Sequence, residues 1–197
     1  MKLIDFKKVK DGKFIKNYEL KYLNNEGKEK IFEIISHNDY TSADEIGRKS
    51  SGVSIVALDE SLEHMLILKE FRMGVNKQIY NLCAGRMEKG ETPEDCIRRE
   101  LLEESGLELK RVVRILPPSF AAVALSDIKN QIAIVVVKGT PTGKNASANE
   151  WIVPNMYSKS EALYLVENEE FTSRAQLATY MFAMGAFDNL CLKEAEK

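Results

Sequence analysis

The most constraining feature of this chain is a run of glutamates inside a segment with strong helix signals. Thr92 can accept a hydrogen bond from a free backbone N–H at a helix start, and Pro93 fits the first helical turn. Apolar residues then recur at helical spacing, and Gly106 provides a stop. The pattern predicts a helix over Glu94–Ser105 that buries Leu101 against the protein core.

Three of the glutamates fall on one face of this helix, because residues three and four apart are neighbours. They are Glu100, Glu103 and Glu104. Like charges at this spacing destabilise a helix, so a positive partner is expected. Arg99 can neutralise one carboxylate, whereas magnesium and manganese prefer carboxylate and water oxygens and leave positions open for phosphate. A solvated acidic surface is the usual origin of a short acidic run and is the alternative at this point.

The residues around these glutamates decide between a metal-binding cluster and a solvated acidic surface. The segment reads glycine, five residues, glutamate, seven residues, Arg-Glu, an aliphatic residue, any residue, Glu-Glu, any residue, glycine and an aliphatic residue. These slots are filled by Gly85, Glu91, Arg99, Glu100, Leu101, Glu103, Glu104, Gly106 and Leu107. A chance match in one short chain has a probability on the order of one in a million. The segment therefore resembles the signature of the Nudix hydrolase family.

The resemblance implies a fold and a metal site. The fold class would be α/β (α+β), as a Nudix-type α/β/α sandwich with a mixed sheet, in which the motif forms a loop, a helix and a loop. Glu100 and Glu104 would bind the metal together with the backbone carbonyl of Ala84. The metal would be Mg²⁺, with Mn²⁺ as the alternative. Such ions neutralise a diphosphate and lower the pKa of a bound water.

The resemblance also implies roles for the remaining motif residues. Glu103 would assist the metal-binding glutamates in catalysis, and Arg99 would orient them. Gly85 would permit the loop geometry beside the substrate.

Residues outside the motif resemble the subfamily of ADP-ribose pyrophosphatases and nucleoside diphosphate sugar hydrolases. The run Leu66–Arg72 is similar to its Lys-Gln-Phe-Arg strand, and Tyr80–Gly85 is similar to its Glu-Leu-Pro-Ala-Gly segment. Arg72 is thereby a candidate contact for a substrate phosphate, with a surface ion-pair arginine as the alternative. Glu150, at the end of a loop rich in Gly, Ser and Asn, is placed like a catalytic loop glutamate and is the candidate general base. An ordinary loop glutamate is the alternative there.

The chain departs from this subfamily at two places. Ala121–Leu125 stands where a Ser-Pro-Gly-like loop is usual, and Cys83 stands where proline is usual. Nucleoside diphosphate sugars other than ADP-ribose therefore stay open as substrates. The predicted reaction is hydrolysis of the diphosphate linkage, which gives a nucleoside monophosphate and a sugar phosphate. The alternative is a non-catalytic Nudix-fold module that binds or senses such compounds, and the complete set of motif glutamates favours the enzyme.

The overall composition argues against several classes of protein. The net charge of −2 and the pI near 5.9 argue against a nucleic-acid partner, which normally requires a basic surface. The three cysteines form no CxxC pair and only two histidines occur, so neither a disulfide framework nor a zinc site is expected. No apolar run is long enough to span a membrane, and the first residues lack a signal-peptide core. We expect a cytoplasmic protein that binds neither nucleic acid nor membrane.

The remainder of the chain indicates strands followed by helices. Two alternating runs, Phe14–Leu23 and Lys30–Ile35, flank a turn signal at 24–27 and predict a hairpin. Further strands and helices are expected at 53–58, 65–71, 111–116, 131–138, 151–156, 158–169 and 173–187. We expect residues 1–45 to form an N-terminal β region and residues 46–197 to form the hydrolase domain. The resembled subfamily dimerises through such a β region, which implies a homodimer.

Overall fold

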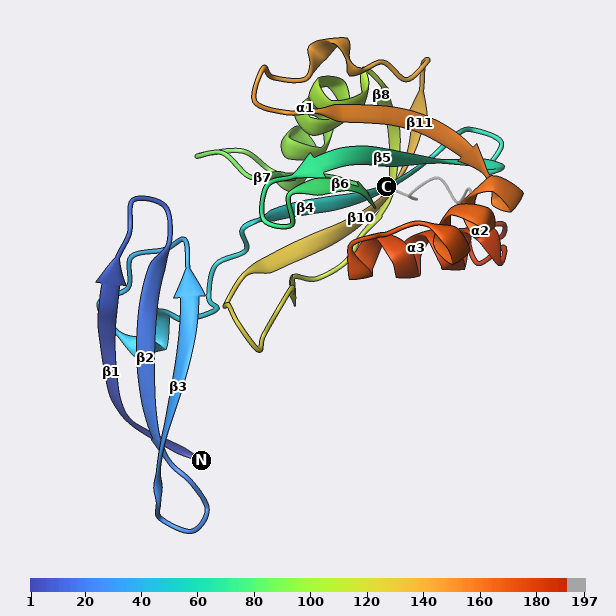
Figure 1. Ribbon diagram of the computed structural model, residues 1–197. Coiled ribbons are helices and arrows are strands. Elements are labelled where there is room, and N and C mark those ends of the chain that lie inside the picture. Colours follow the sequence, from blue (N-terminus) through green and yellow to red (C-terminus); the bar gives the residue numbers. More distant parts are fainter. Residues whose placement is uncertain (191–197) are drawn as a thin grey trace, which may run out of the picture. The chain divides into compact units, whose positions relative to one another are not determined.

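The computed structural model describes residues 1–190, so Cys191 lies outside the described residues (Figure 1). The strands are β1 (Lys2–Asp11), β2 (Lys16–Leu23), β3 (Glu29–Ser36), β4 (Gly52–Leu58), β5 (His64–Arg72), β6 (Lys77–Asn81), β7 (Cys83–Arg86), β8 (Glu108–Ile115), β9 (Ser119–Phe120), β10 (Lys129–Lys138) and β11 (Ile152–Ser158). The helices are α1 (Pro93–Ser105), α2 (Lys159–Asn168), α3 (Ser173–Ala183) and the short 3-10 helices η1 (Ala43–Glu45) and η2 (Gly143–Asn145). These elements form two compact units, Met1–Ser51 with Pro118–Asn130 and Gly52–Pro117 with Gln131–Lys197.

The first unit is built on a three-stranded antiparallel sheet in the order β1-β2-β3. The predicted hairpin is observed as β2 and β3, and its turn is closed by Asn24, whose side-chain oxygen accepts hydrogen bonds from two backbone N–H groups. Gly27 adopts a φ of +77°, which glycine tolerates best. Strand β1 was not predicted, because register shifts between Leu3 and Asp5 and between Lys8 and Lys10 interrupt the alternation of its apolar residues.

The second unit contains seven strands of the eight-stranded sheet, which is covered on both faces. Its main strand order is β11-β5-β4-β10-β8, with β6 added to β5 and β7 to β4. Successive side chains of a strand point to opposite faces. On β5, Leu66 and Leu68 therefore pack with α1 residues, whereas Met65 and Ile67 pack with α2 and α3 (Figure 1). The predicted α/β sandwich with a small N-terminal antiparallel β region is confirmed.

Helix α1 forms where the sequence predicts it. Thr92 accepts a hydrogen bond from the backbone N–H of Asp95, whose side chain returns to the Thr92 backbone, so both ends of this capping pair are satisfied. Gly106 ends the helix with a φ of +68°. Leu101 is fully buried as predicted, whereas Leu102, which also fits the helical period, is half exposed. Burial of Leu101 fixes which face of α1 turns toward the sheet.

The C-terminal helices close over the opposite face of the sheet. Helix α3 ends at Ala183, earlier than its apolar pattern suggests, and Gly185 follows with a φ of +76°. Just before α3, residues 170–172 run along the free edge of β6: the Tyr80 N–H donates to the Glu170 carbonyl (2.8 Å), and the Thr172 N–H donates to the Tyr80 carbonyl (3.1 Å). No helix within residues 1–190 is both long enough and apolar enough to cross a membrane.

Candidate active site

Helix α1 places its three glutamates at different depths. Glu100 and Glu104 lie one turn apart and are 8% and 7% exposed, whereas the side chain of Glu103 is 52% exposed. Glu100 lies against Gly85, and Glu104 accepts a hydrogen bond from Ala84, so the two deeper carboxylates lie against β7. The arrangement is therefore two buried carboxylates with a third at the rim, rather than three equivalent surface charges.

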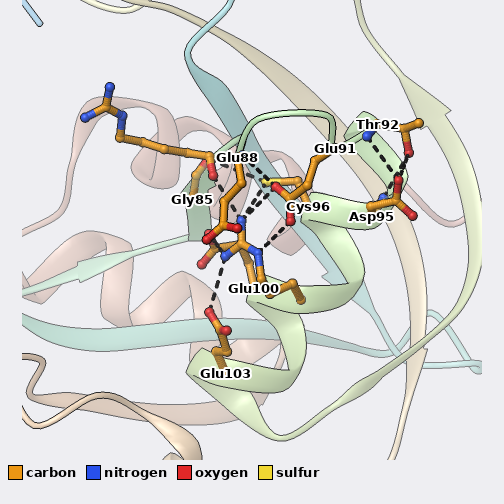
Figure 2. Close-up of polar contacts among 10 residues, drawn as sticks. Gly85, Glu88, Glu91, Thr92, Asp95, Cys96, Glu100 and Glu103 are labelled. Carbon is orange, nitrogen blue, oxygen red and sulfur yellow. Dashed lines mark hydrogen bonds and ion pairs between the residues drawn. The ribbon is translucent and has the colours of Figure 1, made fainter.

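Arg99 forms ion pairs with three carboxylates, those of Glu91, Glu100 and Glu103. Figure 2 labels these three glutamates. Its guanidinium donates to both carboxylate oxygens of Glu91 at 2.7 and 3.0 Å. It also donates to Glu100 at 2.6 Å, to Glu103 at 3.3 Å and to the Arg86 carbonyl at 3.0 Å. The hydrogen bonds from Arg99 lower the pKa of Glu91 to about 2, and the same contacts raise the pKa of Arg99. Arg99 is thus held in place by Glu91 while it orients Glu100 and Glu103.

Glu104 has a different environment. One of its oxygens accepts a hydrogen bond from the Ala84 backbone N–H at 3.0 Å. Burial raises the pKa of Glu104 to about 8, and the pKa of Glu100 is raised by burial as well. In the described part of the chain, Glu104 has no ion-pair partner within 4.0 Å. A buried carboxylate without a counter-charge is unstable in its ionised form, so this position favours a bound cation.

Gly85 leaves the space that Glu100 occupies. It lies on β7, opposite Val53 of β4. A methyl group added to Gly85 would lie 1.6 Å from the Glu100 carboxylate oxygen and 1.8 Å from its carboxyl carbon. No side chain fits there unless Glu100 moves, so the glycine is required by the close approach of helix and strand.

Two buried thiols line the site, and sequence reasoning assigned a role to neither. The Cys83 thiol lies within hydrogen-bonding reach of the Glu104 carboxylate, and burial raises its pKa. Cys96 lies 4.0 Å from the Gly85 carbonyl and 3.6 Å from an Arg99 nitrogen, and burial raises its pKa to about 12. Both groups are therefore neutral thiols at ordinary pH, which makes them poor nucleophiles.

The residues predicted outside the motif are found on neighbouring elements. Arg72 ends β5, with a side chain that is 56% exposed and a nitrogen 3.5 Å from Glu70. Glu150 is exposed and accepts a hydrogen bond from the Ser147 backbone at 3.2 Å. Its charge is one of the causes of the raised pKa of Glu100, so the loop brings Glu150 close to the motif glutamates.

Sequence reasoning missed Glu70, a buried carboxylate that is 5% exposed. Its charge contributes to the raised pKa of Glu104. The signal was present in β5, because Glu70 continues the alternation of Leu66 and Leu68 toward the same face.

The donor set suits a hard divalent cation. Glu100 and Glu104 supply carboxylate oxygens, the backbone of Ala84 is hydrogen-bonded to Glu104, and the burial of Glu104 favours a nearby positive charge. Within residues 1–190, no three acidic, histidine or cysteine side chains already converge on one point that could hold an ion. The reason is visible in the contacts, because Arg99 draws Glu100 and Glu103 to its guanidinium. The residues fit a cation if Glu100 exchanges part of its contact with Arg99 for the ion.

Comparison with known proteins identifies the family. The family model of the NUDIX domain matches residues 48–175. The chain belongs to the Nudix family. Helix α1 and the strand that leads to it lie inside the matched region, so the prediction of a Nudix hydrolase is confirmed.

Individual relatives are distant. The Nudix chain is 28% identical over 145 residues to a methanol dehydrogenase activator of Bacillus methanolicus, covering 72% of this chain and 76% of that protein. It is 27% identical over 138 residues to an ADP-ribose pyrophosphatase of Bacillus subtilis, covering 68% and 71%. A crystal structure titled as an ADP compounds hydrolase superposes with a TM-score of 0.69 at 15% identity, covering 94% of this chain and 93% of the other. That structural likeness confirms the fold.

Proposed function

We propose that this Nudix hydrolase cleaves the diphosphate linkage of a nucleoside diphosphate sugar such as ADP-ribose and requires Mg²⁺, for which Mn²⁺ can substitute. The products are a nucleoside monophosphate and a sugar phosphate. The observation that carries the proposal is the pair of buried carboxylates on α1, Glu100 and Glu104, of which Glu104 lacks a cationic partner within residues 1–190. The ADP-ribose pyrophosphatase of Bacillus subtilis, similar over most of its length, supports the same substrate class.

The metal would be held by Glu100, Glu104 and the Ala84 carbonyl. When bound, such ions neutralise the diphosphate and lower the pKa of a coordinated water. Glu103, at the rim, assists by accepting hydrogen bonds from groups that enter the site. Arg99 would orient Glu100 and Glu103, since one of its terminal nitrogens contacts both.

The chain supplies two further functions on its own. Arg72 would bind a substrate phosphate, because its exposed guanidinium lies on the sheet face that α1 covers. Glu150 would accept the proton of the attacking water, because a carboxylate on a loop can approach the substrate as the loop closes. Its influence on the pKa of Glu100 supports this position.

We also propose a cytoplasmic homodimer that forms through residues 1–45. The sheet of the first unit exposes apolar side chains, among them Ile4, Ile31 and Phe32. Ile31 and Phe32 are adjacent on β3 and point to opposite faces of the sheet, and each is a candidate contact for a partner subunit. The buried free thiols Cys83 and Cys96 suit a reducing compartment. Sedimentation equilibrium of the full chain tests the dimer, and a monomer at all concentrations contradicts it.

The function is tested with a panel of nucleoside diphosphate sugars, Mg²⁺ and detection of the released monophosphate. Wild type should cleave at least one compound, and Glu104→Gln should abolish turnover. Glu94→Gln is the matched control, because Glu94 lies on the same helix but is exposed and paired with Arg98. Binding without cleavage across the panel would replace the hydrolase with a sensing module, and full activity of Glu104→Gln would refute the metal assignment.

A further inference from the structure

A chain of hydrogen bonds joins the start of α3 to the site face of the sheet. The hydroxyl of Thr172 donates to the side-chain oxygen of Asn81 at 2.6 Å. The side-chain nitrogen of Asn81 donates to Glu70 at 2.6 Å. The same oxygen of Glu70 lies 3.5 Å from the Nε atom of Arg72. We call these three residues, Thr172, Asn81 and Glu70, the Glu70 network.

The direction of each bond in the network is determined by chemistry. The amide nitrogen of Asn81 donates to the carboxylate of Glu70, so the amide oxygen points the other way. The Asn81 oxygen then faces Thr172 and accepts a hydrogen bond from its hydroxyl group. The contact with Glu70 therefore sets the orientation of the Asn81 amide, because turning the amide over would place its oxygen against the carboxylate.

The side chain of Thr172 joins this network and does not cap its own helix. It is the N-cap residue of α3, yet its side chain makes no capping hydrogen bond, whereas Thr92 and Ser158 both cap their helices. Its backbone is held along β6 by the hydrogen bond to the Tyr80 carbonyl. The hydroxyl of Thr172 thereby reaches Asn81, which lies 91 positions earlier in the chain.

The network ends at Arg72. Glu70 is buried, and Arg72 is its only ion-pair partner in the part of the chain that the structure describes. Glu70 and Arg72 are two residues apart on β5, so they point to the same face. Because the Nε atom of Arg72 faces Glu70, the two terminal nitrogens of its exposed guanidinium are left for another ligand. That fork matches two oxygens of a phosphate group.

We propose that Glu70 and Asn81, fixed by Thr172, are positioning residues that hold Arg72 in the orientation in which it binds the substrate phosphate. The phosphate role of Arg72 rests on the proposed function, whereas the positioning of Arg72 by the network can be measured without turnover.

The kinetic test compares Glu70→Gln, Thr172→Val and Thr172→Ser. Glu70→Gln should raise KM by about tenfold with little change in kcat. This is the effect of weakening one charge-assisted hydrogen bond between Arg72 and the substrate phosphate. Thr172→Val should raise KM less, and Thr172→Ser, which keeps the hydroxyl, should restore it. Glu170→Gln is the control, because Glu170 lies in the same segment but its side chain pairs with exposed Lys77.

A double-mutant cycle separates positioning from a purely structural role. If Glu70 acts through Arg72, then Glu70→Gln should have almost no further effect on KM in an Arg72→Ala background. Additive effects in the cycle, or a fall in kcat and melting temperature without a change in KM, would overturn the proposal.

A spectroscopic readout keeps the test independent of activity. The Nε–H signal of Arg72 in ¹⁵N-labelled protein is assigned by its loss in Arg72→Ala. It should shift or broaden in Glu70→Gln and Thr172→Val and stay unchanged in Glu170→Gln. An unchanged signal in all variants refutes the positioning, whereas a wild type that cleaves no compound refutes only the proposed function.

Discussion

The buried carboxylate of Glu104 makes the stability of the metal-free protein depend on pH. In the folded chain Glu104 keeps its proton up to about pH 8, whereas in the unfolded chain it ionises near its ordinary value of 4.5. Between these values the folded state binds a proton that the unfolded state lacks. The contribution of protonated Glu104 to the free energy of unfolding is therefore at its maximum below about pH 4.5. It falls as the pH rises, by about 1.4 kcal/mol per pH unit. Over the whole window the loss amounts to about 5 kcal/mol.

The assay is urea unfolding of wild type and Glu104→Gln in EDTA at several pH values from about 5 to about 8.5. Glutamine has the shape of the protonated acid and does not ionise, so the difference between the two proteins isolates Glu104 from Glu100, whose pKa is raised in the same direction. Wild type should lose stability relative to the variant as the pH rises. Parallel curves for the two proteins would refute the reasoning.

Mg²⁺ should reverse the effect at the alkaline end. An ion that binds only the folded protein stabilises it by mass action, and it competes with the proton on Glu104. The increment in unfolding free energy on adding Mg²⁺ should therefore grow from about pH 5.5 to about pH 8 in wild type and be small in Glu104→Gln. An increment of equal size in both proteins would place the ion elsewhere.

Three further substitutions have expected outcomes. Gly85→Ala inserts a methyl group 1.6 Å from the Glu100 oxygen, so activity should fall about 10–100-fold while circular dichroism shows an intact fold. Leu101→Ala empties a fully buried site and should lower the unfolding free energy by about 2–5 kcal/mol in urea titrations. Glu91→Gln removes the carboxylate that holds Arg99, so turnover in steady-state assays should fall about 10–100-fold with little change in melting temperature.

Local signals made the Nudix helix predictable. The cap at Thr92, the stop at Gly106 and the burial of Leu101 depend on residues within one or two turns, and all three are observed. The motif spacing likewise indicated the glutamates. It could not say that Glu103 lies at the rim while Glu104 is buried, because that difference depends on the loop and strands packed against the helix.

Contacts between distant parts of the chain could not be predicted from the sequence. The short strands β6 and β7 have few residues and no clear alternation, yet they carry Asn81, Ala84 and Gly85 into the site. From the sequence Thr172 has the pattern of an ordinary helix cap. Only its position beside β6 shows that its hydroxyl donates a hydrogen bond to Asn81. Periodicity detects which face of an element is buried but not what that face meets.

The need for a cation follows from the placement of charge rather than from the number of glutamates. Arg99 is already shared among Glu91, Glu100 and Glu103. On this face Arg72 also pairs with Glu70, whose charge disfavours ionisation of Glu104 further. Glu104 is therefore the carboxylate that the described side chains leave without a counter-charge. A divalent ion at that point would relieve the cost of ionising Glu104. It would also add positive charge to the face that carries Arg72, the residue proposed to bind the substrate phosphate.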